Sequence, residues 1–231
     1  MKIERSGPEV ATYHLSYTGR RLRFRPGQFV HLAIDPFDPS RHWPESRVFS
    51  IASGRDAETI RLTVSRQGGY TSRILDELKV GDTVWLKGPY GDFVVQAQGR
   101  DDHSVLVAGG TGITPFCAFM EEWLRDPGAC LNPVHLYYGA RTADLLVYRY
   151  LADRCASELP RFSVRYYIEH GHCDSAVPGR LDIDQIVTHQ EEVRRCVFYL
   201  SGPKAMIDGF SAGLRETYGV LSGRVVVDAW D

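Results

Sequence analysis

The sequence predicts two domains, a small antiparallel β-barrel followed by an α/β domain with a parallel sheet. In the N-terminal part, apolar and polar side chains alternate in short runs that are separated by turn residues. In the C-terminal part, short apolar runs alternate with helical patterns, which is typical of a parallel sheet covered by helices. The stretch between them, VQAQGRDD, is polar and poor in large side chains. We therefore expect a boundary near Gly99, with domains at 1–98 and 99–231.

Alternation and turn residues locate the elements of the first domain. The pairs Ile60/Leu62 and Tyr13/Leu15 alternate with polar neighbours, as in half-buried antiparallel strands. Strands are expected around residues 13–17, 28–34, 47–53, 59–66 and 84–86. The proline-containing segment 35–45 is expected to be a loop, and the sequence GPYGDF a turn. A short helix should follow Gly68 and Gly69 and stop before Gly81.

In the second domain, five apolar runs predict the parallel strands, at residues 104–108, 134–138, 164–168, 197–200 and 224–227. The helices between them should begin near Ile113, Ala143, Asp182 and Pro203. The last of these has the clearest pattern, because Met206, Phe210 and Leu214 recur every four residues.

Composition excludes several classes of function. The 231 residues are 43% hydrophobic, enough for two modest cores, and the net charge of −2 offers no general attraction to nucleic acid or anionic membranes. The sequence shows neither a signal peptide nor an apolar run long enough to span a membrane. The five cysteines are scattered without C-x-x-C spacing, which argues against a structural zinc or an iron–sulfur cluster. We expect reduced thiols in the cytoplasm.

The stretch VLVAGGTGITP, residues 105–115, carries the most direct chemical signal. A buried strand enters a glycine turn, and the following helix holds Pro115 in its first turn. Backbone amides at such a helix start form a site for phosphate. Pro115 stands where a G-x-G-x-x-G motif would have its third glycine, so a tight connection without a ligand is the alternative.

Two stretches of the first domain suggest a second anion site. In RVFS, Arg47 could pair two phosphate oxygens, Phe49 could lie flat against a flavin, and Ser50 could bond its redox nitrogen. The alternative is a barrel strand with a surface arginine. The turn Gly69-Tyr70-Thr71-Ser72 opens a helix, where it could hold phosphate, cap the helix, or do both.

The ordered set RVFS, GGYTS, GGTGITP, YYGART and SGP resembles the ferredoxin–NADP reductase superfamily over nearly the whole chain, from about Arg21 to Asp231. The resemblance implies a flavin-binding barrel and a pyridine-nucleotide domain. It also implies an FAD-dependent NAD(P)H oxidoreductase that passes electrons to a separate acceptor. Such an acceptor would be a ferredoxin- or flavodoxin-like protein, an oxygenase component or a small molecule. No fused iron–sulfur domain is evident.

The resemblance also implies roles for particular residues. FAD would be held by the residues of the first domain, Arg47, Val48, Phe49, Ser50, the backbone around Thr63 and Val64, and Gly69, Tyr70, Thr71 and Ser72. The nicotinamide nucleotide would be held by those of the second, Gly110, Thr111, Gly112, Pro115, Arg141, Gly202 and Pro203. Trp230 could cover the flavin. Ser50 is the first catalytic candidate and Ser201 the second, and no general base is assigned because the cofactors carry the chemistry.

Three features of the sequence leave alternatives open. Ser201 replaces the cysteine of the superfamily's C-G-P motif, so a non-catalytic redox-sensing or assembly subunit is the rival hypothesis. FMN could replace FAD if Gly69 to Ser72 only cap a helix. Glu169 and His170 occupy the place where NADP-specific relatives have serine and arginine, which slightly favours NADH, although Arg141 and Arg180 favour NADPH. The sequence HGHCD, residues 170–174, is expected to be a solvated loop without a metal.

Overall fold

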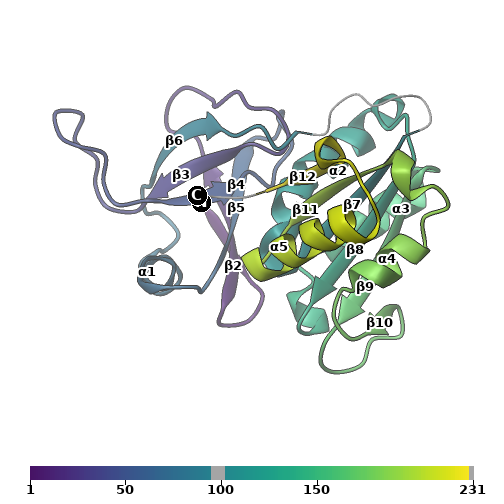
Figure 1. Cartoon of the computed structure of the whole chain (residues 1–231). Helices are drawn as coiled ribbons and strands as arrows, with labels where there is room; N and C mark the ends of the chain where they lie inside the picture. The colour runs from purple at the N-terminus through teal and green to yellow at the C-terminus, as the bar shows by residue number, and fades with distance from the viewer. Residues whose placement is uncertain (95–101, 229–231) are drawn as a thin grey trace. The chain divides into compact units, whose positions relative to one another are not determined.

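The computed structural model describes residues 1–94 and 102–228 (Figure 1). They belong to two units, one of Met1–Val94 with Thr114–Phe119, the other of Val95–Ile113 with Met120–Asp231. The expected boundary at Gly99 lies outside the described residues, so the division into 1–98 and 99–231 stays a prediction.

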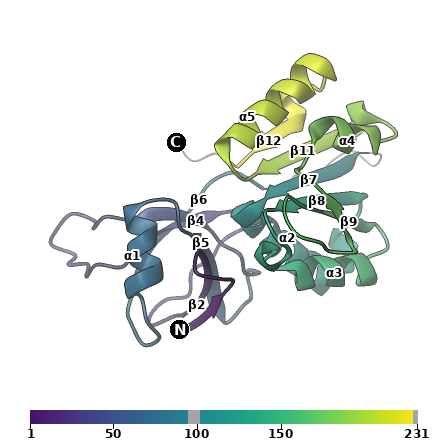
Figure 2. The ribbon, with the colours of Figure 1, turned by 90° about the horizontal axis from the view of Figure 1, so that it is seen from below.

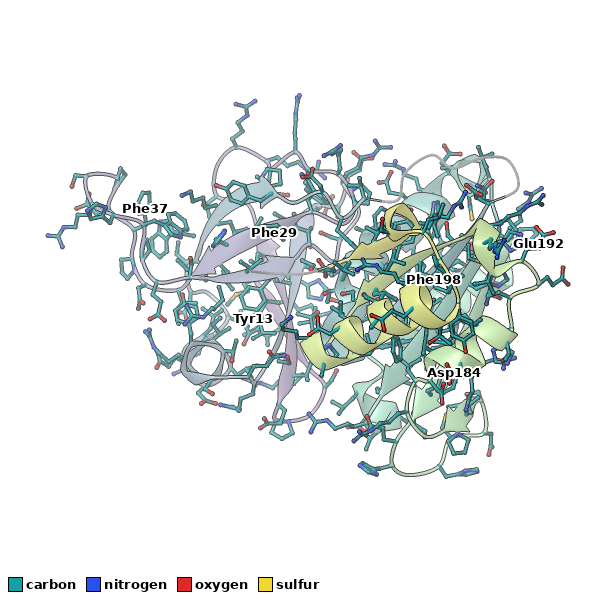
Figure 3. The ribbon with its side chains drawn as sticks, viewed as in Figure 1. Tyr13, Phe29, Phe37, Asp184, Glu192 and Phe198 are labelled. Carbon is teal, nitrogen blue, oxygen red and sulfur yellow. The ribbon has the colours of Figure 1, made fainter. Side chains whose placement is uncertain are left out.

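Two three-stranded antiparallel sheets enclose the core of the first unit. One has the order β1 (Lys2–Arg5), β2 (Val10–Ser16), β5 (Thr59–Ser65), and the other β4 (Arg47–Ser50), β3 (Phe29–Ala33), β6 (Trp85–Tyr90). Most residues of β2 and β5 are buried, and Tyr13, labelled in Figure 3, has no exposed surface. The helix α1 (Gly69–Glu77) adds Ile74 and Leu75 to the same core. These sheets are the antiparallel β-domain that the sequence predicts.

Two strands of this unit differ from the expectation. β1 was not expected, because its four residues KIER carry a single apolar side chain. β6 continues through Gly88 and Pro89, where a turn was expected. The β3–β6 register shifts between Phe29 and His31, so Pro89, which has no N–H, lies at a bulge where the ladder needs no donor.

A six-stranded parallel sheet forms the second unit, in the order β10-β9-β8-β7-β11-β12. Figure 2 shows α4 and α5 on one face of this sheet and α2 and α3 on the other. The fold class is therefore as predicted. The strands are β7 (His103–Gly109), β8 (Val134–Ala140), β9 (Phe162–Ile168), β10 (Ala176–Pro178), β11 (Cys196–Ser201) and β12 (Val225–Val227). The α-helices are α2 (Thr114–Arg125), of which Thr114–Phe119 belongs to the first unit, α3 (Arg149–Glu158), α4 (Ile183–Thr188) and α5 (Lys204–Ala212).

Three of these helices begin within a residue of the expected positions, and α3 does not. A helix was expected from Ala143, but only a short 3₁₀ turn lies there and α3 begins at Arg149. The buried Tyr138 hydroxyl donates to the carbonyl of Val147 (3.0 Å), which holds the intervening segment against the sheet. Tyr148 then has φ of 62°, a left-handed conformation that a right-handed helix cannot continue. The short edge strand β10 was also not expected.

The carboxyl ends of β7 and β11 meet at the point where the strand order reverses. β8, β9 and β10 lie on one side of β7 and β11 and β12 on the other, and ligands of open α/β sheets bind at such a reversal. The glycine turn after β7 packs directly on the end of β11. A Cβ atom at Gly112 would lie 2.3 Å from the Ser201 carbonyl oxygen, so only glycine fits.

The close contact between Gly112 and the Ser201 carbonyl predicts that Gly112→Ala destabilises the protein. The added methyl group cannot be accommodated without moving the backbone of one turn, at a cost of about 1–3 kcal/mol. Gly209→Ala is the matched control, because Gly209 lies in α5 and a Cβ there meets nothing within 4 Å. Thermal unfolding should show a lower midpoint for Gly112→Ala and an equal or higher one for Gly209→Ala. Equal midpoints for Gly112→Ala and the wild type would contradict the described packing.

Candidate cofactor sites

Arg47 of β4 lies beside the first turn of α1. Its guanidinium carbon is 4.9 Å from the centre of the Tyr70 ring, and Tyr70 is the second residue of α1. RVFS and GGYTS, which are separate in the sequence, therefore meet in the fold. A cation and a helix start in one place form a site suited to a phosphate or pyrophosphate group.

The Arg47 side chain is held in place and remains accessible. It donates to Glu45 Oε1 (2.9 Å) and to the Ser46 carbonyl (2.8 Å). The side chains of Arg47 and Glu45 are 50% and 55% exposed, so water screens this ion pair. A phosphate could therefore share the guanidinium without displacing a buried partner. Glu45 has no feature in the sequence that marks it as a partner of Arg47.

The start of α1 combines a cap with open amides. The Thr71 hydroxyl oxygen accepts from the amides of Gln67 (2.9 Å) and Gly68 (3.1 Å). Helix geometry leaves the amides of Gly69, Tyr70 and Thr71 without an intrahelical acceptor. A Cβ at Gly68 or Gly69 would meet nothing within 4 Å, so there is room beside these amides. Ser72 already belongs to the helical ladder, since its amide donates to the Gly68 carbonyl (2.9 Å).

Tyr70 contributes its backbone to this place, while its side chain points into the barrel core. The ring is 4% exposed, and burial raises the pKa of the phenol. Its hydroxyl donates to the Glu45 carbonyl (2.7 Å) and accepts from the Ile34 amide (3.1 Å). Arg73, one turn later, binds both carboxylate oxygens of Asp35 (2.8 and 3.2 Å). Helix α1 therefore fixes both ends of the loop between β3 and β4.

The residues of β4 pair with those of β3 in an antiparallel ladder. Phe49 is opposite Val30 and packs against the barrel core, whereas Val48 is opposite His31 and Ser50 is opposite Phe29. On the neighbouring β5, the Thr63 hydroxyl lies 2.9 Å from that of Thr12, and Val64 is fully buried. The role inferred for the backbone of Thr63 and Val64 stays a prediction.

The nucleotide motifs also meet, at the carboxyl ends of β7 and β11. Residues Gly110–Ile113 form a 3₁₀ turn in which Gly110 has φ of +56°, and Pro115 lies in the first turn of α2. Gly202 and Pro203 follow β11, and a Cβ at Gly109 would lie 2.9 Å from Pro203 Cδ. Thr111 lies in the 3₁₀ turn, between Gly110 and Gly112. This arrangement brings the two glycine turns of the second unit into direct contact.

Ser201, the second catalytic candidate, is bonded to a buried carboxylate. Its hydroxyl donates to Asp228 Oδ2 (2.8 Å), and the two residues are only 2% and 6% exposed. The Asp228 amide in turn donates to the Leu200 carbonyl (2.9 Å), which fixes the carboxylate beside β11. No local pattern marks this pairing, because the partners are 27 positions apart in the chain. Trp230 lies outside the described residues, and its role stays a prediction.

Two family models match the chain, one for each unit's motifs. The oxidoreductase FAD-binding domain matches residues 2–95, and the oxidoreductase NAD-binding domain matches residues 106–212. The chain belongs to the ferredoxin–NADP reductase superfamily. It therefore carries an FAD-binding and an NAD(P)-binding domain.

Relatives of this superfamily member include two proteins of Pseudomonas putida. The toluate 1,2-dioxygenase electron transfer component is 32% identical over 198 residues, which are 84% of this chain and 55% of the relative. A flavohemoprotein is 34% identical over 224 residues, 94% of this chain and 53% of the relative. The chain thus spans about half the length of the curated relatives it matches.

Solved structures share the fold of this superfamily member. The FAD/NAD-binding domain of a nitric oxide dioxygenase from Vibrio cholerae has a TM-score of 0.83 at 20% identity, with 99% of this chain and 95% of that one covered. A ferredoxin–NADP⁺ reductase from Neisseria gonorrhoeae has a TM-score of 0.82 at 17% identity, covering 98% and 94%. None of the helices in residues 1–94 and 102–228 has the length and apolar character needed to cross a membrane. The cytoplasmic location stays a prediction.

In this superfamily member, four side chains predicted to bear on nucleotide choice lie together. They follow the adjacent strands β8, β9 and β10, and the His170 amide donates to the Arg141 carbonyl (2.8 Å). Arg180 Nε donates to Glu169 Oε2 (2.9 Å), with Arg180 81% exposed and Glu169 25% exposed. Glu169 and Arg180 therefore form an ion pair. A carboxylate is expected to repel a 2′-phosphate and a guanidinium to attract it.

The HGHCD segment forms hydrogen bonds and an ion pair of its own. His172 Nε2 lies 2.8 Å from Asp174 Oδ1, and Cys173 Sγ accepts from Arg149 Nη1 (3.3 Å). Hydrogen bonds from Ser175, and then from Arg149, lower the pKa of the Cys173 thiol. Burial instead raises the pKa of Cys155 to about 12 and that of Cys196 to about 11. In the part of the chain that the structure describes, no group of three His, Cys, Asp or Glu side chains could hold a metal ion.

Proposed function

We propose that the protein is an FAD-dependent NAD(P)H reductase that delivers electrons to a separate acceptor. The observation that carries this proposal is the contact of Arg47 with the side chain of Tyr70, from the first turn of α1, in a domain of the FAD-binding family. The bound FAD would supply the conversion of a hydride into single electrons, NAD(P)H + 2 A(ox) → NAD(P)⁺ + H⁺ + 2 A(red), where A is a one-electron acceptor. The protein contributes binding, orientation and access.

In the first domain, charge and room determine how FAD is held. Arg47 and the amides of Gly69, Tyr70 and Thr71 would neutralise and bond the pyrophosphate, which FMN lacks. Three residues along β4 from Arg47, Ser50 would donate to the redox nitrogen of the ring, and Phe49 would lie against the ring. The backbone of Thr63 and Val64 would border its edge. These roles favour FAD over FMN.

In the second domain, Gly110, Thr111, Gly112 and Pro115 would position the nicotinamide dinucleotide, with Arg141 near its ribose or phosphate. Gly202 and Pro203 would close over the nicotinamide. The Ser201 hydroxyl donates its hydrogen bond to Asp228, so its oxygen would be left to accept a hydrogen bond from this ligand. Ser201 would therefore orient the nicotinamide carboxamide, which has N–H donors, and would not supply a proton to the reaction.

The names of the relatives support a protein as the acceptor. One is the electron transfer component of toluate 1,2-dioxygenase, and another is the reductase component of propane 2-monooxygenase from Mycolicibacterium smegmatis. Both names describe parts of multicomponent oxygenase systems. A separate oxygenase or ferredoxin-like component is accordingly the acceptor that we propose.

NADH is the proposed electron donor. Glu169 follows β9, where its carboxylate would repel a 2′-phosphate and could accept a bond from the ribose hydroxyl. The ion pair with Arg180 would keep Glu169 in place through one oxygen and leave the other for the ribose. The same pair neutralises Arg180, the cation that would otherwise attract a phosphate.

We expect Arg47→Ala to weaken FAD binding much more than FMN binding. The loss of charge-assisted bonds to the pyrophosphate should cost about 1.5–3 kcal/mol, or roughly 10- to 100-fold in the dissociation constant. Flavin fluorescence during titration of the apoprotein measures both constants. Arg215→Ala, on an exposed side chain of the other unit, is the control and should change neither. Equal affinities of the wild type and Arg47→Ala for FAD would rule out this pyrophosphate site.

Glu169→Gln should change the choice of nucleotide. Removal of the carboxylate charge releases Arg180 and abolishes the repulsion of a 2′-phosphate, so kcat/KM should rise for NADPH and fall for NADH. We expect the NADH/NADPH ratio of kcat/KM to fall about 10-fold. Steady-state rates with a small quinone acceptor measure this ratio. Glu216→Gln, at an exposed position of the same unit, is the control. An unchanged ratio in Glu169→Gln would remove Glu169 from nucleotide selection.

A further inference from the structure

The side chain of Met206 lies against both glycine turns of the proposed nucleotide site. A Cβ atom at Gly109, which ends β7, would lie 2.9 Å from Met206 Sδ. A Cβ atom at Gly202, which follows β11, would lie 2.8 Å from Met206 Cε. Real Cβ atoms essentially never come this close to a neighbour. The thioether therefore fills the space that a side chain on either glycine would need.

Helix geometry directs Met206 to this place. Met206 is the third residue of α5, and its amide donates to the Pro203 carbonyl (2.9 Å). Side chains of an α-helix point back toward its start, so the side chain of Met206 covers the turn that precedes α5. Met206 also packs against the buried apolar cluster of the second unit. It thus joins the two glycine turns to this core through apolar contacts.

Met206 is within reach of solvent, unlike Met120. The side chain of Met206 is partly exposed, whereas Met120, which belongs to α2, has no exposed surface. Oxidation of methionine to its sulfoxide requires that the oxidant reach the sulfur atom. The two methionines of the second unit are therefore expected to differ in reactivity.

We propose that Met206 is an oxidation site through which hydrogen peroxide lowers the affinity of the protein for the nicotinamide nucleotide. The inference rests on the proposed function, because the contact affects binding only if the two glycine turns hold a nucleotide. The thioether sulfur gives up two electrons and takes one oxygen atom from the peroxide, whose O–O bond breaks, and water leaves. The balance is R–S–CH₃ + H₂O₂ → R–S(O)–CH₃ + H₂O.

The sulfoxide does not suit the place that the thioether fills. A carbon atom added to Gly109 or Gly202 would already lie too close to Met206, so an oxygen atom on this side of the sulfur has no room. The sulfoxide oxygen also needs a hydrogen-bond partner, which water supplies. The oxidised side chain would turn toward solvent and leave the backbone of both turns without its packing partner. The turns would then hold the nucleotide less firmly, with no change in the residues of the first unit.

The test measures nucleotide binding before and after treatment with hydrogen peroxide. The probe is tetrahydro-NAD, a mimic of NADH that cannot transfer a hydride, and calorimetry gives its dissociation constant for the FAD-loaded protein. Peptide mass spectrometry locates the added oxygen. Met206→Leu removes the accessible sulfur and keeps an apolar side chain of similar size. Met120→Leu removes the buried sulfur and is the matched control.

In the wild type, oxygen should appear on Met206 before Met120, and the dissociation constant of tetrahydro-NAD should rise roughly 5- to 20-fold. Met120→Leu should respond as the wild type does, whereas Met206→Leu should bind the probe equally well before and after treatment. Methionine sulfoxide reductases, one for each epimer, should restore the affinity of the wild type, and dithiothreitol alone should not. The affinity for FAD, measured by flavin fluorescence, should stay constant.

An equal loss of affinity in Met206→Leu would overturn the proposal and direct attention to the partly exposed thiol of Cys173. Oxidation of Met206 that leaves binding unchanged would overturn it as well, as would oxygen on Met120 ahead of Met206. Failure of the untreated wild type to bind tetrahydro-NAD would instead refute the proposed nucleotide site, so the two failures are distinguishable.

Discussion

The packing of Gly112 against the Ser201 carbonyl is the constraint on which the second unit depends. Gly112 lies in the turn after β7 and Ser201 ends β11, and the sheet order reverses at these neighbouring strands. Because no side chain separates these turns, their backbone atoms and the carboxyl ends of both strands lie at one place. Ser201, whose carbonyl makes this contact, also donates through its hydroxyl to Asp228. The missing Cβ of Gly112 therefore determines how closely the proposed nucleotide site approaches this serine.

In the first unit, the side chains and the backbone of helix α1 have different parts in the proposed site. In α1, the side chains of Tyr70 and Arg73 hold the ends of the loop between β3 and β4, through Ile34, Glu45 and Asp35. The backbone amides of the same helix start stay open. The residues at the start of α1 thus stabilise the loop through their side chains and offer their backbone amides to the proposed ligand. This explains how Tyr70 can be a core residue and still lie in a motif that resembles a pyrophosphate site.

Much of this arrangement could be predicted from the sequence, because it depends on local patterns. Alternation along β2 and β5, the glycine turn before α2 and the fourfold spacing in α5 are all visible within a few residues. The late start of α3 could not be predicted, because it depends on a bond from Tyr138 of β8 to Val147. The Ser201–Asp228 bond and the Glu169–Arg180 pair likewise need the fold, because each joins segments that follow different strands. The proposed site residues stand out as motifs of the sequence, whereas the partners of Ser201 and Glu169 are set by tertiary contacts.

The central claim is that this chain brings a flavin and a nicotinamide nucleotide together for hydride transfer. An anaerobic titration of the FAD-loaded protein with NADH, followed by the flavin absorbance near 450 nm, tests it most directly. The account predicts that about one equivalent of NADH per flavin bleaches the band, because a hydride carries two electrons. A band that persists in excess NADH and excess NADPH, while dithionite still bleaches it, would contradict the account.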